Sequence, residues 1–245
     1  MNRYYYDLHV HSCLSPCGDN DNTPHNIAGM ATLCGLNIVA LTDHNSCQNC
    51  PAFFAAAEKH GIIPVAGMEL TTSEDIHVVC LFEHLSDALS FDAFVDTQRI
   101  KIKNKPHIFG EQKILDADDN YLCDVDSLLI NATAISVADV ADTVNRFGGI
   151  CYPAHIDRDS NGIIAVLGDL PTDARFNLYE LHDGALVDEY ATKYHIPKEC
   201  FIISSDAHYL TDFRDKENFF EFESETQNPN GVRAELFKLL RRLCI

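Results

Sequence analysis

Short runs of strand-forming residues alternate along this chain with helical patterns, and several of the runs end at a cluster of polar residues. The runs include GLNIVALTDHN, GIIPVAGMEL, EDIHVVCLF, GGICYPAHID and CFIISSDAHYL. Such alternation favours a parallel sheet or barrel, and these folds place their sites at the carboxyl ends of the strands. We therefore expect an α/β fold whose functional site lies where the polar clusters meet.

The helical patterns carry start and stop signals. Thr23 and Pro24 precede the pattern PHNIAGMATLCG and predict a helix start there. In SVADVADTVNRFGG, Ser136 is the expected N-cap, Asp139 follows three residues later, and Gly148 is the expected stop. The final segment, GVRAELFKLLRRLCI, places apolar side chains on one stripe, which predicts a helix that packs on the core.

The length of 245 residues suits one large α/β unit, and a composition of 46% hydrophobic and 22% charged residues is that of an ordinary globular protein. We expect a single domain over residues 1–245. The segment from about Pro106 to Ile130 interrupts the alternation, because GEQKILDADDNYLCDVDSLLI is typical of a hairpin with its turn near DADDN. We interpret residues 106–130 as an insertion within the domain.

Membrane and secretion signals are missing from the sequence. No apolar run approaches the roughly 18 residues of a membrane span, and the first residues lack the apolar core of a signal peptide. We therefore expect a cytoplasmic protein without a membrane partner. Ten cysteines are scattered through the expected strands and helices, which favours reduced thiols over a disulfide scaffold.

The net charge of −19, from 37 acidic against 18 basic residues, opposes attraction to a polyphosphate backbone, which needs clustered lysine and arginine. This balance disfavours nucleic acid as a partner. Bound divalent cations would reverse the charge locally, so a small anionic substrate could still be drawn to a metal-lined pocket.

The stretch DLHVHSCLSPCGDND gathers metal-binding side chains at the end of an expected strand. Alternate residues of a strand face the same way, so His9 and His11 would project together. Two imidazoles on one face suit a shared cation, although a hydrogen-bonded histidine pair is equally compatible with this spacing alone. The rest of the chain has to decide between the two.

Further candidate ligands lie near the ends of the other expected strands. Together with the first pair they are His9, His11, His44, Glu69, His77, His155, Asp206 and His208, with Asp19 and Asp43 as outer candidates. That is too many for one ion. Imidazole and carboxylate ligands suit Zn, Mn or Fe, and carboxylates can bridge two ions. We therefore predict two or three divalent metal ions.

Six motifs, in the order DLHVHS, TDHN, GMEL, HVV, PAHID and SDAH, carry a resemblance to a known family. They resemble the motifs of the PHP (polymerase and histidinol phosphatase) family, and the resemblance spans residues 7–208. It implies a distorted (β/α)7 barrel of TIM-like type, up to three metal ions, and hydrolysis of a phosphoester.

The resemblance also implies how the ligands are shared. The first ion would be held by His9, His11, Glu69 and Asp206. Glu69 would bridge to a second ion, held also by His77 and His155. A third ion would use His44 and His208 with one residue of the loop after His11.

That loop offers Cys17, Asp19 and Asp21 where many family members have a histidine or an aspartate. We favour Asp19, because a carboxylate leaves the ion a stronger Lewis acid than a thiolate would. Cys17 is the alternative, because its distance from His11 matches some relatives. A further alternative is a separate four-thiolate zinc site made by Cys13, Cys17, Cys47 and Cys50.

The leading functional hypothesis is hydrolysis of a small phosphomonoester by a metal-activated water. Arg158 is the candidate phosphate clamp, because a guanidinium can donate two parallel hydrogen bonds, although a surface ion pair with Asp157 or Asp159 would also explain it. His208 or Asp43 could protonate the leaving group. The alternatives are a phosphodiesterase or exonuclease that acts on nucleotides or nucleic acid ends, and a catalytically silent, metal-stabilised binding module.

Overall fold

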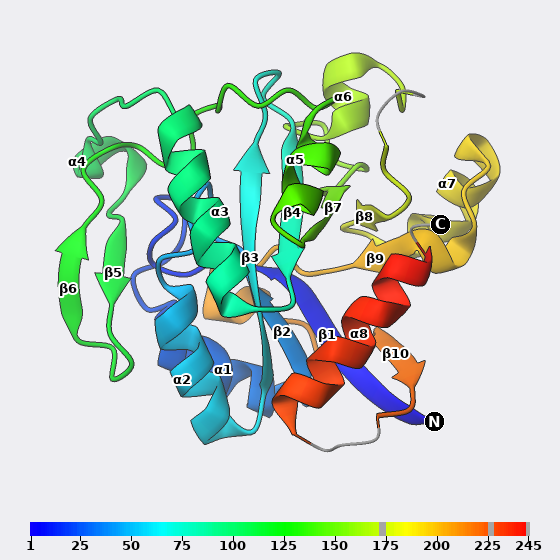
Figure 1. The fold of residues 1–245 in the computed structure, drawn as a ribbon, viewed down its shortest axis with the longest axis horizontal. Coiled ribbons are helices and arrows are strands. Elements are labelled where there is room, and N and C mark those ends of the chain that lie inside the picture. Colours follow the sequence, from blue (N-terminus) through cyan, green and yellow to red (C-terminus); the bar gives the residue numbers. More distant parts are fainter. Residues whose placement is uncertain (172–174, 225–227, 244–245) are drawn as a thin grey trace.

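The computed structural model describes residues 1–171, 175–224 and 228–243, shown as a ribbon in Figure 1. The strands are β1 (Asn2–Val10), β2 (Ile38–Leu41), β3 (Ile63–Thr71), β4 (His77–Phe82), β5 (Lys113–Leu115), β6 (Tyr121–Asp124), β7 (Ile150–Pro153), β8 (Tyr179–Leu181), β9 (Phe201–Ile203) and β10 (Phe219–Phe222). The α-helices are α1 (Pro24–Leu33), α2 (Cys50–His60), α3 (Leu85–Gln98), α4 (Pro106–Phe109), α5 (Val140–Arg146), α6 (Ile163–Leu167), α7 (Val187–Tyr194) and α8 (Pro229–Leu243).

Six of these strands form one curled sheet in the order β10-β1-β2-β3-β4-β7. The pairs β1–β2 and β2–β3 are parallel, whereas β1–β10, β3–β4 and β4–β7 are antiparallel. A separate parallel pair consists of β8 and β9. The expected α/β class is confirmed, but the expected count of seven parallel strand–helix units is not, because the described strands form a half-barrel of mixed direction.

A tight turn explains why β4 reverses direction. The amide of Thr72 donates to the carbonyl of Ile76 at 2.9 Å, and the Thr72 hydroxyl accepts from the Ile76 amide at 3.2 Å. So short a connection cannot make the crossover that a parallel strand needs. His77, the first residue of β4, therefore pairs with Thr71 near the end of β3. It reaches the same edge of the sheet as residues that end parallel strands.

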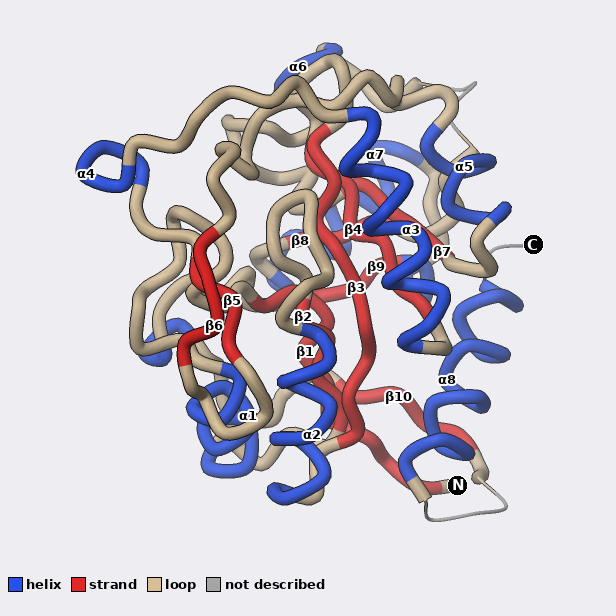
Figure 2. The backbone as a smooth tube through the Cα atoms, turned by 60° about the vertical axis from the view of Figure 1, so that its left-hand side comes forward, coloured by secondary structure: helices blue, strands red, loops and turns tan. Residues whose placement is uncertain are grey.

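Alternate residues of the sheet enter two apolar clusters, one on each face. In β2, Ile38 and Ala40 belong to the cluster that includes residues of α8, and Val39 and Leu41 belong to the cluster that includes residues of α1, α2 and α3. All four side chains are fully buried, as expected for a strand covered on both faces. Figure 2 shows α3 alongside β3 and β4 on the second of these faces.

The helix signals at Thr23 and Gly148 are confirmed, whereas the helix expected after Ser136 begins only at Val140. The Thr23 side chain accepts from the Asn26 amide and caps α1, as predicted. The Ser136 hydroxyl accepts from the Asp139 amide at 3.2 Å and donates to the Asp139 carboxylate at 2.6 Å, as expected of a cap, but it closes the turn before α5, which begins at Val140 with Asp139 as its N-cap. Gly148, with a φ of 76°, follows the end of α5 as predicted. Among the described helices, none is long and apolar enough to cross a membrane.

The expected hairpin is present as β5 and β6, which pair with each other apart from the main sheet (Figure 2). It is fixed to the loop that follows β1. The amide of Lys113 donates to the carbonyl of Cys13 at 2.9 Å, and the Asn49 side chain donates to the carbonyl of Lys113 at 3.0 Å. Gly110 has a φ of 103°, and a Cβ there would lie 1.8 Å from the carbonyl oxygen of Pro16. The segment 106–130, which we predict to be an insertion, therefore packs directly against the loop next to the candidate ligands.

Candidate metal centre

The two histidines at the end of β1 point to the same side. His9 and His11 are fully buried, and their Nε2 atoms lie 3.1 Å apart. Val10, between them, is buried in an apolar cluster. Two ring nitrogens at this distance share either a proton or a cation.

Two carboxylates complete the first group of ligand atoms. Glu69 comes from β3 and Asp206 from the turn after β9, and both are buried. The Nε2 atom of His9 lies 3.3 Å from Glu69 Oε1 and 3.3 Å from Asp206 Oδ1. The Nε2 atom of His11 lies 3.3 Å from Glu69 Oε2 and 3.2 Å from Asp206 Oδ1. One ligand atom from each residue lies within 4.8 Å of the other three, which suits a single cation.

Two further groups share residues with the first. Glu69 groups with His44 and His77, whose Nδ1 atoms lie 3.0 Å from Oε2 and 2.8 Å from Oε1. His11 groups with His44 and His208. His155 lies outside the three groups, but its Nε2 atom is 3.2 Å from Glu69 Oε1. Glu69 therefore stands where it could bridge two ions, and the structure places His44 beside both His77 and His208.

Several buried atoms of these residues lack a well-oriented hydrogen bond. They are Nδ1 of His44, His77 and His155, Oε2 of Glu69, and Oδ1 of Asp206. Buried polar atoms are nearly always hydrogen-bonded, so such a concentration of exceptions needs an explanation. Imidazole and carboxylate donors that converge in this way fit divalent cations such as zinc, manganese or iron.

The charges of the cluster suit metal binding. Burial favours the neutral form of Glu69, but His77, His9 and His44 outweigh it and hold the pKa of that carboxyl well below its usual range. Burial lowers the pKa of His44 to about 3 and, with the nearby charge of His11, that of His208 to about 4. These three side chains are therefore already in the deprotonated forms that ligate metals.

His9 and His11 differ from the other ligands in their protonation. Burial works to lower the pKa of His11, but Asp206 and Glu69 outweigh it and raise the pKa to about 9. The pKa of His9 is also raised well above its usual value, because Glu180, Asp206 and Glu69 outweigh its burial. An incoming cation must displace these protons.

The backbone bends sharply where two of the candidate ligands leave their strands. His155 has a φ of 28° and Asp206 a φ of 53°, in the left-handed region that residues other than glycine rarely adopt. Conformations of this kind cost of order 1–3 kcal/mol each and cluster at functional sites. The fold holds both residues in this conformation, with their side chains beside Glu69 and His9.

Asp43 lies one layer behind the ligands. Its Oδ1 accepts from the Ser12 amide and the Ser15 hydroxyl, both at 2.7 Å, and its Oδ2 accepts from the Ser12 hydroxyl at 2.7 Å. The Ser15 hydroxyl also lies 2.9 Å from Nδ1 of His11. Asp43 is therefore linked to His11 through Ser15.

The structure does not bring the loop candidates into the three ligand groups. The Asp19 carboxylate accepts a hydrogen bond from the Asp21 amide at 2.8 Å, a contact within its own loop. Cys17 is an exposed residue whose thiol still lies against protein atoms, and this partial burial, with the charge of Glu69, raises the pKa of the thiol to about 12. The choice between the two residues stays a prediction.

The four-thiolate alternative finds no support in the described residues, because none of their metal-binding groups contains a cysteine. Cys47 and Cys50 are buried and direct their thiols to the carbonyl of Gly67. The thiol of Cys13 approaches the carbonyl of Lys113 instead. The described cysteines are all free, as expected for reduced thiols.

Arg158 contacts the carboxylate of the candidate ligand Asp206 rather than its sequence neighbours. Its Nη1 lies 2.5 Å from Asp206 Oδ2, and its Nη2 lies 3.0 Å from Nδ1 of His182. The alternative of a surface ion pair with Asp157 or Asp159 is not seen in the described residues, where the ion pair of Arg158 is with Asp206 and Asp157 accepts from the amides of His182 and Asp183. Arg158 thus lies beside the metal ligands and keeps further N–H donors free for an anion.

A pocket of about 350 Å³ opens at this point. We call it the arginine pocket; it is lined by Arg158, His182, Ser205, Asp206, His208, Asp212 and Arg214. Since two of these residues belong to the ligand groups, a molecule bound here would touch the metal centre.

Sequence reasoning missed Glu180, His182 and Arg214. Glu180 lies within 3.1 Å of the ring of His9 from a strand of three residues, too short to stand out as a periodic pattern. His182 follows that strand directly, so the rule that polar residues at strand ends build the site could have found it. Arg214 lies in an irregular segment before β10, where no periodicity marks it.

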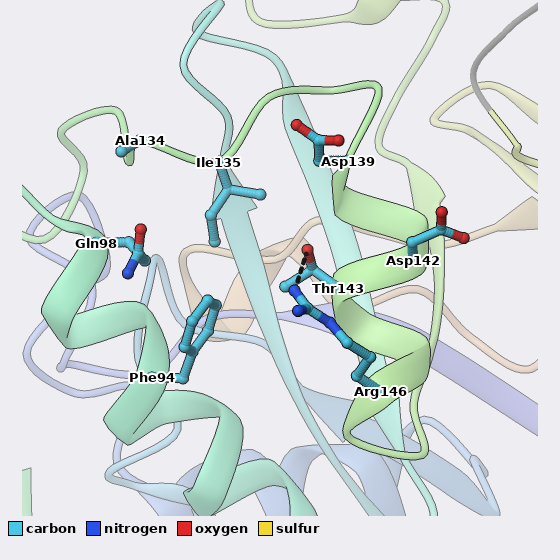
Figure 3. A pocket seen from close by; sticks show the side chains of 8 residues that line it. All are labelled: Phe94, Gln98, Ala134, Ile135, Asp139, Asp142, Thr143 and Arg146. Atoms are coloured by element: carbon cyan, nitrogen blue, oxygen red, sulfur yellow. Dashed lines mark hydrogen bonds between the residues drawn. The ribbon is translucent and has the colours of Figure 1, made fainter.

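A second hollow, of about 440 Å³, lies between α3 and α5. Figure 3 shows Phe94 and Gln98 on the first helix facing Thr143 and Arg146 on the second, with Ile135 between them. This hollow contains none of the residues of the three ligand groups. The chemistry described above therefore concentrates in the arginine pocket.

Residues 7–158 match the family model described as the PHP domain. The match covers more than half of the chain. The chain belongs to the PHP domain family. Membership confirms the resemblance to this family: five of the six motifs lie within the matched residues, and SDAH, at residues 205–208, lies beyond them.

Solved structures share the PHP fold at low identity. The lesion-specific endonuclease PfuEndoQ from Pyrococcus furiosus is similar with a TM-score of 0.61 and 20% identity, over 95% of this chain and 55% of that chain. An amidohydrolase from Chromobacterium violaceum, with bound sulfate and no metal, gives 0.54 and 17%, over 89% and 92%. A two-domain protein from Bacteroides vulgatus that contains a predicted PHP-like metal-dependent phosphoesterase gives 0.53 and 15%, over 99% and 69%.

This PHP chain thus spans little more than half the length of the endonuclease. No curated protein matches it in sequence. The expectation that nucleic acid is disfavoured finds no support in the comparisons, because one of the similar structures is an endonuclease.

Proposed function

We propose that this PHP chain hydrolyses a small phosphomonoester with two or three divalent ions. The observation that carries the proposal is the convergence of the three ligand groups beside Arg158, whose guanidinium contacts the ligand Asp206 while its side chain stays 37% exposed. A phosphate bound to the ions would lie within reach of this guanidinium. The pocket there also has a volume in the range of small-molecule sites.

Divalent ions held by these ligands would lower the pKa of water and neutralise the charge of the phosphate. The chain's own residues hold and orient the reacting groups. Arg158 binds the phosphate with the N–H donors that Asp206 and His182 leave free. Asp43 acts as a positioning residue, because its contacts go to Ser12 and Ser15 and not to the pocket.

His208 was expected either to hold a metal or to protonate the leaving group. Burial and the charge of His11 lower its pKa to about 4, so the ring is neutral at pH 7. A neutral imidazole is a metal ligand and a poor acid. We therefore assign His208 to metal binding, with His11 and His44.

A second candidate function is hydrolysis of a phosphodiester in a nucleic acid. It is favoured by the fold shared with PfuEndoQ over 95% of this chain. The net charge of −19 opposes it, because nucleic acid binding needs clustered basic residues.

Three substrates separate the candidates: p-nitrophenyl phosphate, its bis ester and a labelled oligonucleotide, each with protein loaded with Zn, Mn or Fe. We expect turnover of the monoester to exceed that of the bis ester and of the oligonucleotide. Preferential cleavage of the oligonucleotide would establish the second candidate instead. Absence of turnover with every metal would favour the catalytically silent binding module. Glu69→Gln, purified in the same way, is the control, because activity from a contaminating phosphatase would persist in that sample.

A further inference from the structure

A second arginine faces the arginine pocket, and none of the roles above uses it. Nη1 of Arg214 donates to the carbonyl of His182 at 2.8 Å, and Nη2 lies 3.0 Å from Nε2 of that ring. Within the described ranges Arg214 forms no ion pair, although the chain has 37 acidic residues. An arginine without a carboxylate partner beside a pocket is available to an anionic ligand.

The contacts give the order of groups along the pocket. Asp206, a candidate metal ligand, contacts Nη1 of Arg158 at 2.5 Å. Nη2 of Arg158 lies 3.0 Å from Nδ1 and 3.4 Å from Nε2 of His182, and Nη2 of Arg214 lies 3.3 Å and 3.0 Å from the same two atoms. Among the described residues Arg214 makes no hydrogen bond or ion pair with a residue of the ligand groups and is linked to Asp206 through His182 and Arg158, so it is available to a part of the substrate other than the group at the metal centre.

The groups around Arg214 leave its charge uncompensated. Burial, then Arg158 and then Arg214 lower the pKa of His182, so two guanidinium groups face a neutral ring. Asp212 lines the pocket, but its carboxylate accepts from the amides of His208 and Tyr209. Asp157 is bound in the same way to backbone amides. The remaining carboxylate of this pocket, Asp206, belongs to the first ligand group. Asp7 and Asp215 line a smaller hollow together with Arg214, but within the described ranges neither forms an ion pair with it.

We propose that Arg214 binds a second anionic group of the substrate, a carboxylate or a phosphate, while the metal centre and Arg158 bind the scissile phosphate. This inference rests on the proposed function and narrows its substrate class to phosphomonoesters with two anionic groups. His182 contacts both guanidinium groups and holds Arg214 through its carbonyl and its ring. The volume of about 350 Å³ accommodates a small molecule that spans both arginines.

Three ligands that cannot be hydrolysed test the proposal by calorimetry on the metal-loaded protein. Propylphosphonate carries one anionic group, 3-phosphonopropionate adds a carboxylate, and propane-1,3-bisphosphonate adds a second phosphonate. We expect one of the two-anion ligands to bind about tenfold more tightly than propylphosphonate, since a charge-assisted hydrogen bond in a partly exposed pocket has about this effect. Which of the two gains more identifies the second group as carboxylate or phosphate.

Variants separate binding by Arg214 from a merely structural role. Arg214→Gln should reduce the preference for the two-anion ligand about tenfold, and Arg214→Lys should restore part of it. Arg158→Gln should weaken all three ligands alike and leave the preference. Arg3→Gln removes the same charge from the exposed Arg3–Glu221 pair and should change nothing. An unchanged preference in Arg214→Gln, or an equal loss for all three ligands, would overturn the proposal.

Turnover distinguishes failure of this inference from failure of the proposed function. 3-Phosphoglycerate and glycerol 3-phosphate differ by a carboxylate in place of a hydroxymethyl group. If both are hydrolysed with equal kcat/KM, and fructose 1,6-bisphosphate is no better than fructose 6-phosphate, the second-anion site is refuted while the phosphatase stands. If no monoester is hydrolysed but the ligand preference persists and depends on Arg214, the site stands and the proposed reaction fails.

Discussion

Nδ1 of His9 lies 2.9 Å from Oε1 and 3.1 Å from Oε2 of Glu180, and both residues are fully buried. The same carboxylate accepts from the amide of His155 at 3.1 Å. A carboxylate on one ring nitrogen fixes the imidazole tautomer and presents the other nitrogen to a metal. Nε2 of His9 accordingly faces Glu69 and Asp206. Glu180 thus orients a candidate ligand without lying in a ligand group itself.

Glu180→Gln should weaken binding of the ion held by His9. The amide keeps the shape but loses the charge that orients the ring, and such changes typically cost about 10–100-fold in metal affinity. Competition with a chromophoric chelator measures the affinity. Glu189→Gln, which changes an exposed residue of α7, is the matched control. Equal metal affinity in the two variants would show that Glu180 does not support the metal centre.

Glu69→Gln should lower turnover by about 10³-fold or more, a loss comparable to removing a major electrostatic element of an active site. The reason is that Glu69 lies within 3.3 Å of five histidine rings and can bridge two ions only as a carboxylate. Metal content is measured in parallel by elemental analysis. Near-normal turnover with full metal content would mean that Glu69 is not a bridge.

Local patterns in the sequence were enough to predict which side chains share a face of β1 and where α1 begins. The spacing of His9 and His11 fixes their shared face, and Thr23 marks the start of α1, because both depend on neighbouring residues only. Strand direction is different. Nothing local in EDIHVVCLF shows that β4 runs antiparallel, since the alternation of side chains is the same in both directions. Because of this reversal, the six-stranded sheet has mixed strand direction, and the expected (β/α)7 count is not confirmed.

The site was predictable where strand ends carry unusual residues and unpredictable where ordinary residues meet from distant segments. Motif order pointed to Glu69 and Asp206 as ligands. Arg158 could not be separated from a surface ion pair, because its partner Asp206 lies 48 positions away. Glu180 looks like any acidic residue until the fold places it against His9, 171 positions away.

Metal binding should release protons at neutral pH. Asp206 and Glu69 outweigh burial and raise the pKa of His11 to about 9, and the pKa of His9 is also raised, so the His9–His11 pair carries at least one additional proton at pH 7 in the metal-free protein. A cation needs both rings neutral, so at least about one proton should leave per first-group ion, and affinity should rise with pH up to about pH 9. Calorimetry in buffers of different ionisation enthalpy counts the protons.

The same shifts set the sign of a stability effect in the metal-free protein. A histidine whose pKa is higher in the folded state stabilises the fold below its unfolded pKa of about 6.5, and this contribution is lost as the pH rises through the folded value. The metal-free protein should therefore lose stability between about pH 6.5 and pH 9. Proton release near zero, together with flat stability over this range, would contradict the assignment of charge to His9 and His11.

The two candidate ligands in the loop after His11, Asp19 and Cys17, predict opposite effects of substitution. If Asp19 completes the third metal site, Asp19→Ala should remove about one ion and lower turnover, while Cys17→Ser should do little. If Cys17 is the ligand, the effects exchange, and cobalt-loaded protein should show intense sulfur-to-metal charge-transfer absorption that Cys17→Ser abolishes. Full metal content and activity in both variants would mean that the loop supplies no ligand.

Gly110→Ala should destabilise the protein more than Gly168→Ala, although both glycines have positive φ. Gly168, after α6, has a φ of 83° and open space around its missing Cβ, so alanine there should cost about 1 kcal/mol of backbone strain. Gly110 has a φ of 103°, and a Cβ there would lie 1.8 Å from the carbonyl oxygen of Pro16, so the cost should be about 3 kcal/mol or more. Urea unfolding measures both costs as shifts in midpoint at constant slope. Since Pro16 lies in the loop after His11, Gly110→Ala should also lower metal content. Equal stability and equal metal content in Gly110→Ala and Gly168→Ala would show that the segment 106–130 does not support the candidate metal centre.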